Sequence, residues 1–137
     1  MTRPLPPRDD SPNGAFWKQL AESGELRFQR CEDCAAWRHP PRHLCGACGS
    51  PRAAWRPSSG RGAILTWTVT HQAFHPAFAS ELPYAVVVSE LEEGIRLVSG
   101  IRELPLAELR VGLPVEVVLE AAGEGVLLPF VRPLAAR

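Results

Sequence analysis

The chain has 137 residues, 45% of them hydrophobic, and its 15 Lys and Arg balance 15 Asp and Glu, so its formal net charge is zero. This hydrophobic content suits a packed core, in one domain or in a small barrel joined to a metal-stabilised module, and argues against wholesale disorder. The 14 Pro and 11 Gly disfavour long helices and coiled coils, and the neutral charge argues against a protein that coats nucleic acid.

The N-terminal residues 1–12 are rich in proline and show no hydrophobic periodicity, which predicts a flexible tail. They lack the apolar stretch of a signal peptide, and we expect no membrane span anywhere in the chain. We therefore expect a cytoplasmic protein. In a reducing compartment, cysteines are more often metal ligands or redox thiols than disulfide partners.

Residues 13–25 predict a short amphipathic helix. Phe16, Trp17 and Leu20 share one helical face, and Gly24 stands where a left-handed residue would end the helix. A helix of two to three turns is not stable alone, so its aromatic face must dock on another surface. Residues 25–30 then alternate polar and apolar side chains, which predicts a strand leading into the first cysteine.

Four cysteines form two C-x2-C motifs separated by ten residues: Cys31, Cys34, Cys45 and Cys48. Each motif brings two thiolates to one tight turn, and two such turns complete a closed tetrahedral site of the structural zinc type. We predict a zinc ribbon over residues 26–58 that holds one structural zinc ion. A rubredoxin-type iron site is an alternative, and so is a thioredoxin-like redox pair, which leaves the second motif unexplained.

The ribbon segment also concentrates positive charge. Residues 27–61 sum to +5, whereas residues 1–26 sum to −1 and residues 62–137 to −4. The arginines of the ribbon, Arg38 and Arg42 among them, either balance the thiolates or form a patch for a phosphate-bearing ligand or an acidic partner. His39 and His43 lie between the two motifs. Because four cysteines saturate the metal, we interpret both histidines as surface or packing residues.

Residues 59–137 predict a small barrel. Five β-rich stretches are separated by turn residues: 63–71, 84–91, 95–101, 115–119 and 126–131. With a brief helical turn at 106–110 between the third and fourth, this order predicts a five-stranded Greek-key barrel of the OB type. The whole chain is therefore expected to be mainly β. Pro129 would cost a ladder hydrogen bond, so the last strand is predicted to be an edge strand or to carry a bulge.

No nucleophile elbow, phosphate loop or metalloprotease motif is present, and we predict no catalytic residue. The concentrated candidates for a functional loop are His71, His75 and Phe78, which follow the first barrel strand. Ordinary loop packing, a surface facing a partner or ligand, and acid–base chemistry are the three interpretations. Trp67 and Tyr84 are either core residues or, in a nucleic-acid-binding barrel, stacking platforms.

A series of short motifs in order resembles the acyl-CoA-associated OB-fold family, also called domain of unknown function 35. The resemblance covers about residues 14–133 and rests on these motifs: Phe16-Trp17, Arg30-Cys31-x-x-Cys34, Pro40-Pro41-Arg42, Cys45-x-x-Cys48-Gly49-Ser50, Trp55, Ser59-Gly60-Arg61-Gly62, His75-Pro76-Ala77-Phe78, Pro83-Tyr84, Leu109-Arg110-Val111-Gly112 and Phe130-x-Arg132-Pro133.

The resemblance implies an N-terminal helix, a rubredoxin-like zinc ribbon and an OB barrel. It also implies a non-catalytic accessory subunit of a thiolase-superfamily enzyme, of the thiolase or aldolase type, acting on acyl-CoA in steroid side-chain or lipid degradation. We expect a hetero-oligomer of two copies of each chain, in which acyl-CoA is contacted. The expected contact residues are Phe16, Trp17, Arg38, Arg42, His71, His75 and Phe78.

Three alternatives remain, one of which is an independent acyl-CoA-binding protein or metal-dependent enzyme. Some members of the family support a hot-dog-fold enoyl-CoA hydratase instead of a thiolase. Zinc ribbons and OB barrels also occur in single-stranded nucleic-acid-binding proteins, although a barrel segment with a charge of −4 is poorly suited to that role and we expect no nucleic-acid partner.

Overall fold

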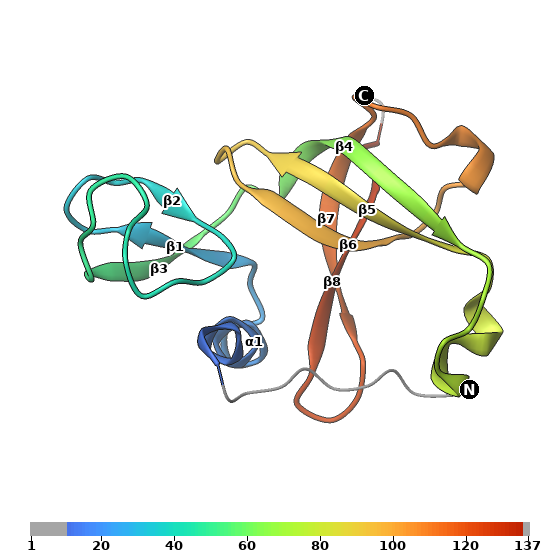
Figure 1. Ribbon diagram of the computed structural model, residues 1–137, viewed down its shortest axis with the longest axis horizontal. Coiled ribbons are helices and arrows are strands. Elements are labelled where there is room, and N and C mark those ends of the chain that lie inside the picture. The colour runs from blue at the N-terminus through green and yellow to red at the C-terminus, as the bar shows by residue number, and fades with distance from the viewer. Residues whose placement is uncertain (1–10, 136–137) are drawn as a thin grey trace.

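The computed structural model describes residues 11–135, which form one helix and two groups of β-strands (Figure 1). The first group follows α1 (Pro12–Ser23) and contains β1 (Arg27–Cys31), β2 (Trp37–Arg38) and β3 (Ala53–Pro57). The second group contains β4 (Arg61–Thr70), β5 (Tyr84–Leu91), β6 (Arg96–Ile101), β7 (Pro114–Ala121) and β8 (Leu127–Pro133), with the 3-10 helices η1 (Pro76–Glu81) and η2 (Leu106–Glu108). The predicted tail lies, for residues 1–10, outside the described residues. Within residues 11–135, no helix has the length and apolar character needed to cross a membrane.

The helix α1 has the ends that its sequence predicts. Pro12 occupies the first turn, where its fixed φ and missing N–H are tolerated. Gly24 closes the helix in the left-handed conformation, with φ 67°, and its N–H donates to the carbonyl of Leu20 at 2.9 Å. The predicted role of Gly24 as the C-terminal residue of the helix is therefore confirmed.

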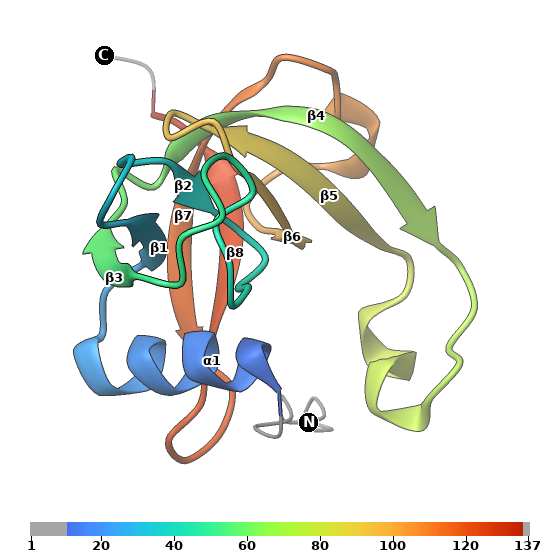
Figure 2. The ribbon, with the colours of Figure 1, turned by 60° about the vertical axis from the view of Figure 1, so that its left-hand side comes forward.

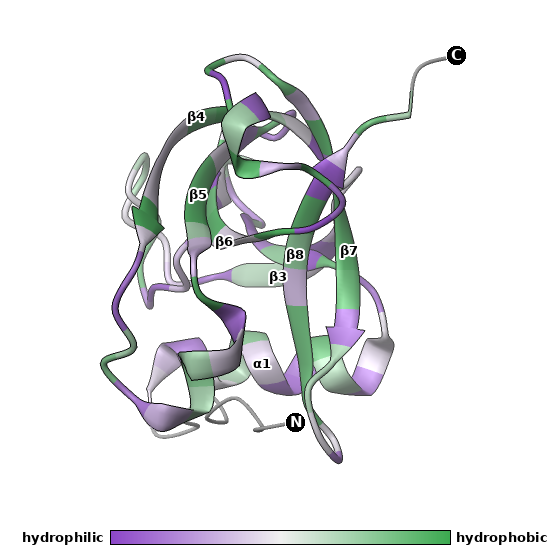
Figure 3. Cartoon of the chain, turned by 90° about the vertical axis from the view of Figure 1, so that its right-hand side faces the viewer, coloured by the Kyte–Doolittle hydropathy of each residue, from purple (hydrophilic) through white to green (hydrophobic). Residues whose placement is uncertain are grey.

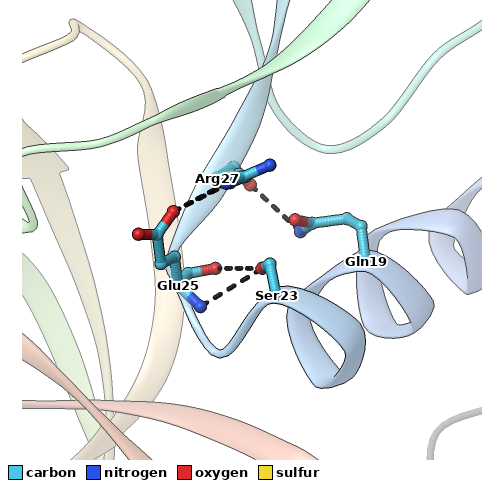
Figure 4. A network of polar contacts seen from close by, with 4 residues as sticks. All are labelled: Gln19, Ser23, Glu25 and Arg27. Atoms are coloured by element: carbon cyan, nitrogen blue, oxygen red, sulfur yellow. Dashed lines mark hydrogen bonds and ion pairs between the residues drawn. The ribbon is translucent and has the colours of Figure 1, made fainter.

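A small polar network fixes the direction in which the chain leaves α1 (Figure 4). The Gln19 side chain donates from Nε2 to the carbonyl of Arg27 at 3.3 Å, which ties the helix to the start of β1. Ser23 Oγ accepts from the N–H of Glu25 and donates to its carbonyl, both at 3.2 Å. Because these bonds are local, they set the angle between the helix and β1, and buried apolar contacts supply the stability.

The first three strands form an antiparallel sheet in the order β2-β1-β3, which is the ribbon. The other five form a closed barrel in the order β4-β5-β6-β8-β7, with β4 and β7 pairing to close it. The pairing of β6 with β8 is parallel and every other barrel pairing is antiparallel. This is the arrangement of an OB-fold. The predicted fold class, mainly β with a short helix, a four-cysteine ribbon and a five-stranded OB barrel, is confirmed.

The prediction that the last strand is an edge or carries a bulge is wrong for the strand as a whole, because β8 pairs with β7 on one side and with β6 on the other. The physical reasoning holds locally at Pro129. This residue pairs with Leu119 of β7, whereas the short parallel pairing with β6 begins only at Phe130. Proline is tolerated there because β8 has a partner strand on one side only at this position.

Two hydrophobic clusters organise the interior. One fills the barrel and includes Ile64, Val87, Val115 and Val131, each at most 1% exposed. The other cluster, here called the joint core, combines residues of α1, β1 and the β5–β6 hairpin: Phe16, Leu20, Leu26, Phe28, Leu91, Ile95 and Leu97. In Figure 2, α1 crosses below the ribbon and in front of the β7–β8 hairpin. The helix therefore packs the ribbon and the barrel into one body.

The joint core makes the stability of the whole chain depend on α1. Leu20 is 0% exposed, so we expect Leu20→Ala to lower the free energy of unfolding by about 2–5 kcal/mol through lost burial and the cavity left behind. The same truncation at Leu44, which is 57% exposed, is the matched control and is expected to cost less than about 0.5 kcal/mol. Urea denaturation measures both, and equal effects of the two variants would contradict the joint core.

Candidate metal centre and contact residues

The two C-x2-C motifs fold into matching turns, or knuckles. In the first, the N–H of Ala35 donates to the carbonyl of Cys31 at 3.0 Å, and in the second the N–H of Gly49 donates to that of Cys45 at 2.9 Å. The fifth residue of each knuckle has a positive φ, 64° at Ala35 and 75° at Gly49. Glycine adopts this conformation freely, whereas alanine is strained in it. The two knuckles therefore have the same backbone path despite different sequences.

The knuckles bring the four thiol groups together. All four Sγ atoms lie within 4.8 Å of one another, and the pairs Cys31–Cys48 and Cys34–Cys45 are 3.6 Å apart. These separations are too long for disulfides and match the sulfur–sulfur distance of about 3.8 Å in a tetrahedral zinc site with Zn–S bonds of about 2.3 Å. The geometry therefore fits one tetrahedral metal ion.

The electrostatics of the four cysteine thiols also favour a bound cation. The backbone N–H of Cys34 lowers the pKa of Cys31 to about 6. At Cys48, the backbone N–H of Ser50 favours the thiolate, but the neighbouring sulfurs of Cys31 and Cys34 outweigh it and raise the pKa to about 12. Four thiolates cannot coexist at these distances unless a divalent cation neutralises part of their charge. The four cysteines are thus positioned to bind one metal ion with no open coordination position, as a structural site requires.

The two histidines between the knuckles lie outside the thiol cluster. His39 packs against the rings of Phe16 and Phe28, with centroid distances of 5.1 and 4.8 Å, and its burial lowers its pKa to about 4. His43 is exposed. The interpretation of the pair as packing and surface residues is therefore confirmed.

The predicted contact residues of the helix and ribbon have different surroundings. Phe16 is 3% exposed and belongs to the joint core, whereas Trp17 is half-buried with its ring edge-on to Phe16 at 5.1 Å. Arg38 is 4% exposed, and its Nη1 donates to the carbonyl of Arg42 at 3.0 Å. The Arg42 side chain is exposed. Phe16 and Arg38 are therefore interior residues of this chain, and of these four side chains only Trp17 and Arg42 are accessible at its surface.

The predicted barrel loop lies apart from these four residues, between β4 and β5. His71 is exposed, and Nδ1 of His75 accepts the N–H of Ala77 at 3.0 Å, so His75 caps η1. Phe78 is half-buried and packs on Tyr84, with their ring centroids 6.2 Å apart. The structure thus brings the four cysteines together but does not gather the seven predicted contact residues at one place.

The remaining arginines of the ribbon are only partly balanced by acidic neighbours. Arg52 forms ion pairs with Glu32 at 3.1 Å and with Asp33 at 3.4 Å. Arg30 donates to the carbonyl of Ala35 and lies 5.0 Å from the ring centroid of Trp37. These contacts leave an exposed ribbon surface that stays positive, because the other exposed arginines have no ion pair among residues 11–135.

Comparisons with known proteins match both parts of the chain. The family model for the rubredoxin-like zinc ribbon domain of ChsH2 matches residues 18–53, and that for the C-terminal OB-fold domain of ChsH2 matches residues 55–120. A solved chain of an "Ltp2-ChsH2(DUF35) aldolase" is 35% identical and superposes with a TM-score of 0.83 over 93% of this chain and 98% of that one.

Two curated relatives are longer proteins. A probable enoyl-CoA hydratase alpha subunit of Thermomonospora curvata is 37% identical over 96% of this chain and 39% of its own length. The 3-oxo-4,17-pregnadiene-20-carboxyl-CoA hydratase alpha subunit of Mycobacterium tuberculosis is 33% identical over 84% of this chain and 35% of its own length. The chain therefore spans little more than a third of these two relatives.

Metal content gives a direct test of the four-thiolate site. We expect about one zinc ion per chain by elemental mass spectrometry. Cys31→Ser or Cys48→Ser removes one ligand, so each variant is expected to lose the metal and to become insoluble or to lose the ordered ribbon. Ser80→Ala, an exposed change far from the knuckles, is the control and should keep its zinc. A metal-free chain with an unchanged melting temperature, or a chain purified with iron, would contradict the zinc site.

The burial of His39 predicts a pH dependence of stability. The unfolded chain takes up a proton at His39 near pH 6.5, but the folded chain does so only near pH 4, so folded stability is lost as the pH falls between these values. We expect the zinc-loaded protein to lose about 1–2 kcal/mol more stability between pH 7 and pH 5 than the His39→Phe variant does. Urea denaturation at the two pH values measures this, with His43→Phe as the control. Parallel pH profiles for the wild-type and His39→Phe proteins would refute the assignment.

Proposed function

The chain belongs to the ChsH2 family, in which a rubredoxin-like zinc ribbon precedes an OB-fold domain, and we propose that it is a non-catalytic accessory subunit of a thiolase-superfamily enzyme acting on acyl-CoA substrates. The observation that carries this proposal is the structural match, over nearly the full length of both chains, to the ChsH2(DUF35) component of an Ltp2 aldolase. A chain of this size and fold therefore has a counterpart in an aldolase assembly.

The geometry supports an accessory role. The metal site has four protein ligands, so its metal stabilises the fold and offers no position to a substrate. In the barrel loop, His75 uses Nδ1 to cap η1, and acid–base chemistry is the weakest of the interpretations of that loop. We accordingly assign the catalytic residues to the partner. When bound, zinc supplies a rigid cross-link between the knuckles, and this chain supplies a preformed docking body.

The joint core gives that docking body its rigidity. Because α1 packs against both β1 and the β5–β6 hairpin, the ribbon and the barrel keep one relative orientation. Trp17 and Arg42 lie on one side of this body and the His71–Phe78 loop lies on the other. In this proposal one partner contacts both sides at the same time. In this proposal Phe16 and Arg38 support the contact surface from within.

The substrate class is proposed from the names of the relatives. One of them is named as a hydratase subunit for a pregnadiene-carboxyl-CoA, which is a steroid acyl-CoA. We extend this to a steroid side-chain or related lipid acyl-CoA as the substrate of the assembly. The acyl-CoA would be bound mainly by the partner. In this chain, the exposed arginines of the ribbon are the positive groups suited to binding its phosphates.

An enoyl-CoA hydratase of the hot-dog fold is the second candidate partner, because two relatives are named as hydratase alpha subunits. We put the aldolase first because the solved chain that superposes on this one, at 35% identity and with a TM-score of 0.83, comes from an aldolase. Binding of single-stranded nucleic acid is disfavoured by the −4 charge of residues 62–137, and no shift of a labelled oligonucleotide is expected even at low salt.

Co-expression with Ltp2 tests the proposal. We expect a complex of two copies of each chain, measured by size exclusion with light scattering, and no turnover of CoA thioesters by the isolated chain. A hot-dog-fold hydratase co-expressed in the same way is the comparison and is expected to bind more weakly. Complete separation from Ltp2 at micromolar concentration would refute the aldolase partner, and stable assembly with the hydratase alone would favour the second candidate.

A further inference from the structure

A groove of about 570 Å³ lies on the outer face of the barrel, between η1 and the loop that joins β7 to β8. Its floor is built around Gly100 of β6. A Cβ atom on this residue would lie 2.7 Å from Cε1 of Phe130, so the phenyl ring rests directly on the glycine backbone. Of the residues named from the sequence, Phe78, Tyr84 and Phe130 belong to this groove. In the sequence, the one sign of this close packing was a glycine, Gly100, inside a predicted strand.

The floor is held in place by a layered contact. The guanidinium carbon of Arg102 lies 3.8 Å from the ring centroid of Phe130, and Glu120 binds that guanidinium at 2.7 and 3.2 Å. The Phe130 ring is therefore fixed between Gly100 and Arg102. Because the charges of Arg102 and Glu120 neutralise each other, the floor is a rigid aromatic surface that is close to neutral.

The rim of the groove is acidic. Glu81 comes from η1 and Glu124 from the β7–β8 loop, and both are exposed. Within residues 11–135, neither carboxylate forms an ion pair. Arg102 is the one basic residue of the lining, and Glu120 neutralises it. The groove thus combines apolar and aromatic walls with two uncompensated negative charges at opposite edges.

The acidic rim and the apolar walls together determine which kind of ligand the groove can bind. The phosphates of acyl-CoA or of a nucleic acid would be repelled by Glu81 and Glu124, whereas Lys and Arg side chains would be attracted. The aromatic rings of Phe78 and Tyr84 in the walls, and of Phe130 in the floor, suit an apolar side chain. Phe74, 84% exposed on the loop before η1, extends the apolar surface beyond the groove. Figure 3 views the molecule from the side on which η1 lies and shows hydrophobic residues along β5 and β8.

We propose that this groove is a docking site for a protein segment of the partner enzyme, in which an apolar side chain enters the groove while flanking Lys or Arg residues meet Glu81 and Glu124. The inference rests on the proposed function, because it assigns the groove to the partner of that complex. It adds the chemistry of the contact, basic and apolar, and excludes the barrel groove as the site of the CoA phosphates.

A charge-reversal experiment in the full chain tests the groove. Glu81→Lys/Glu124→Lys is compared with Glu92→Lys/Glu108→Lys, an equal charge change at exposed positions outside the groove. Titration of each protein into purified Ltp2 is followed by calorimetry at 50 and 500 mM salt. We expect the groove variant to bind at least about tenfold more weakly than wild type at low salt, the deficit to shrink at high salt, and the control to stay within about twofold.

The outcomes separate the two proposals. No binding of wild type to Ltp2 overturns the aldolase partner and, with it, this inference. Normal binding by wild type and by the groove variant at both salt concentrations overturns the groove alone. Circular dichroism and zinc content confirm that each variant is folded, so that weakened binding reports on the surface.

Photo-crosslinking identifies the occupant directly. Replacing Tyr84 with p-benzoylphenylalanine places the photoreactive group in the groove wall. In the complex, we expect crosslinks to a partner peptide with basic and apolar residues. Residues 1–10 of this chain contain Arg3 and Arg8 among prolines and are the competing occupant. Crosslinks to that segment alone, or loss of the partner crosslink when CoA is added at saturating concentration, would overturn the inference.

Discussion

The convergence of four thiolates is the constraint on which the structure depends. Without a cation, the sulfurs of Cys31 and Cys48, 3.6 Å apart, cannot both be charged. The ion pair of Glu32 with Arg52 also joins the two knuckle segments, but it is exposed and contributes little stability. The same strand that ends at Cys31 carries Phe28, which is fully buried in the joint core. Metal binding therefore sets the position of β1, and β1 sets one wall of the joint core. The metal site and the wall of the joint core thus share one strand, with Cys31 and Phe28 three positions apart.

The joint core converts two small modules into one body. A ribbon of this size buries few apolar side chains, and α1 is too short to be stable alone. Each gains a partner only when Phe16 and Leu20 are enclosed between β1 and the β5–β6 hairpin. For the proposed accessory role this matters energetically, because modules that already share a core lose little orientational freedom when they dock, and more of the contact energy remains as affinity.

The sequence contains the parts of this fold that depend on local pattern. Spaced cysteines predicted the metal centre, and a β-rich stretch followed by turn residues predicted β5 over its full extent, Tyr84–Leu91. What local pattern could not reveal is which surface covers an apolar face. Phe16 has the same amphipathic spacing whether it meets a partner or its own chain, and here β1 and the barrel cover it. The groove escaped prediction for the same reason, since Phe78 and Phe130 lie fifty-two positions apart and line one groove only because β6 pairs with both β5 and β8.

The separation of charge along the chain becomes informative once it is placed on a rigid body. A ribbon surface that stays positive and a barrel groove with an acidic rim have opposite electrostatic preferences. A partner that offers a basic segment to the groove would be repelled if it offered the same segment to the ribbon, so only one orientation satisfies both surfaces. The joint core prevents the two modules from rotating to relieve such a mismatch. The net charge is zero, but the charge distribution over the rigid body favours one orientation of a bound partner. With a flexible linker between the modules, this preference would be lost.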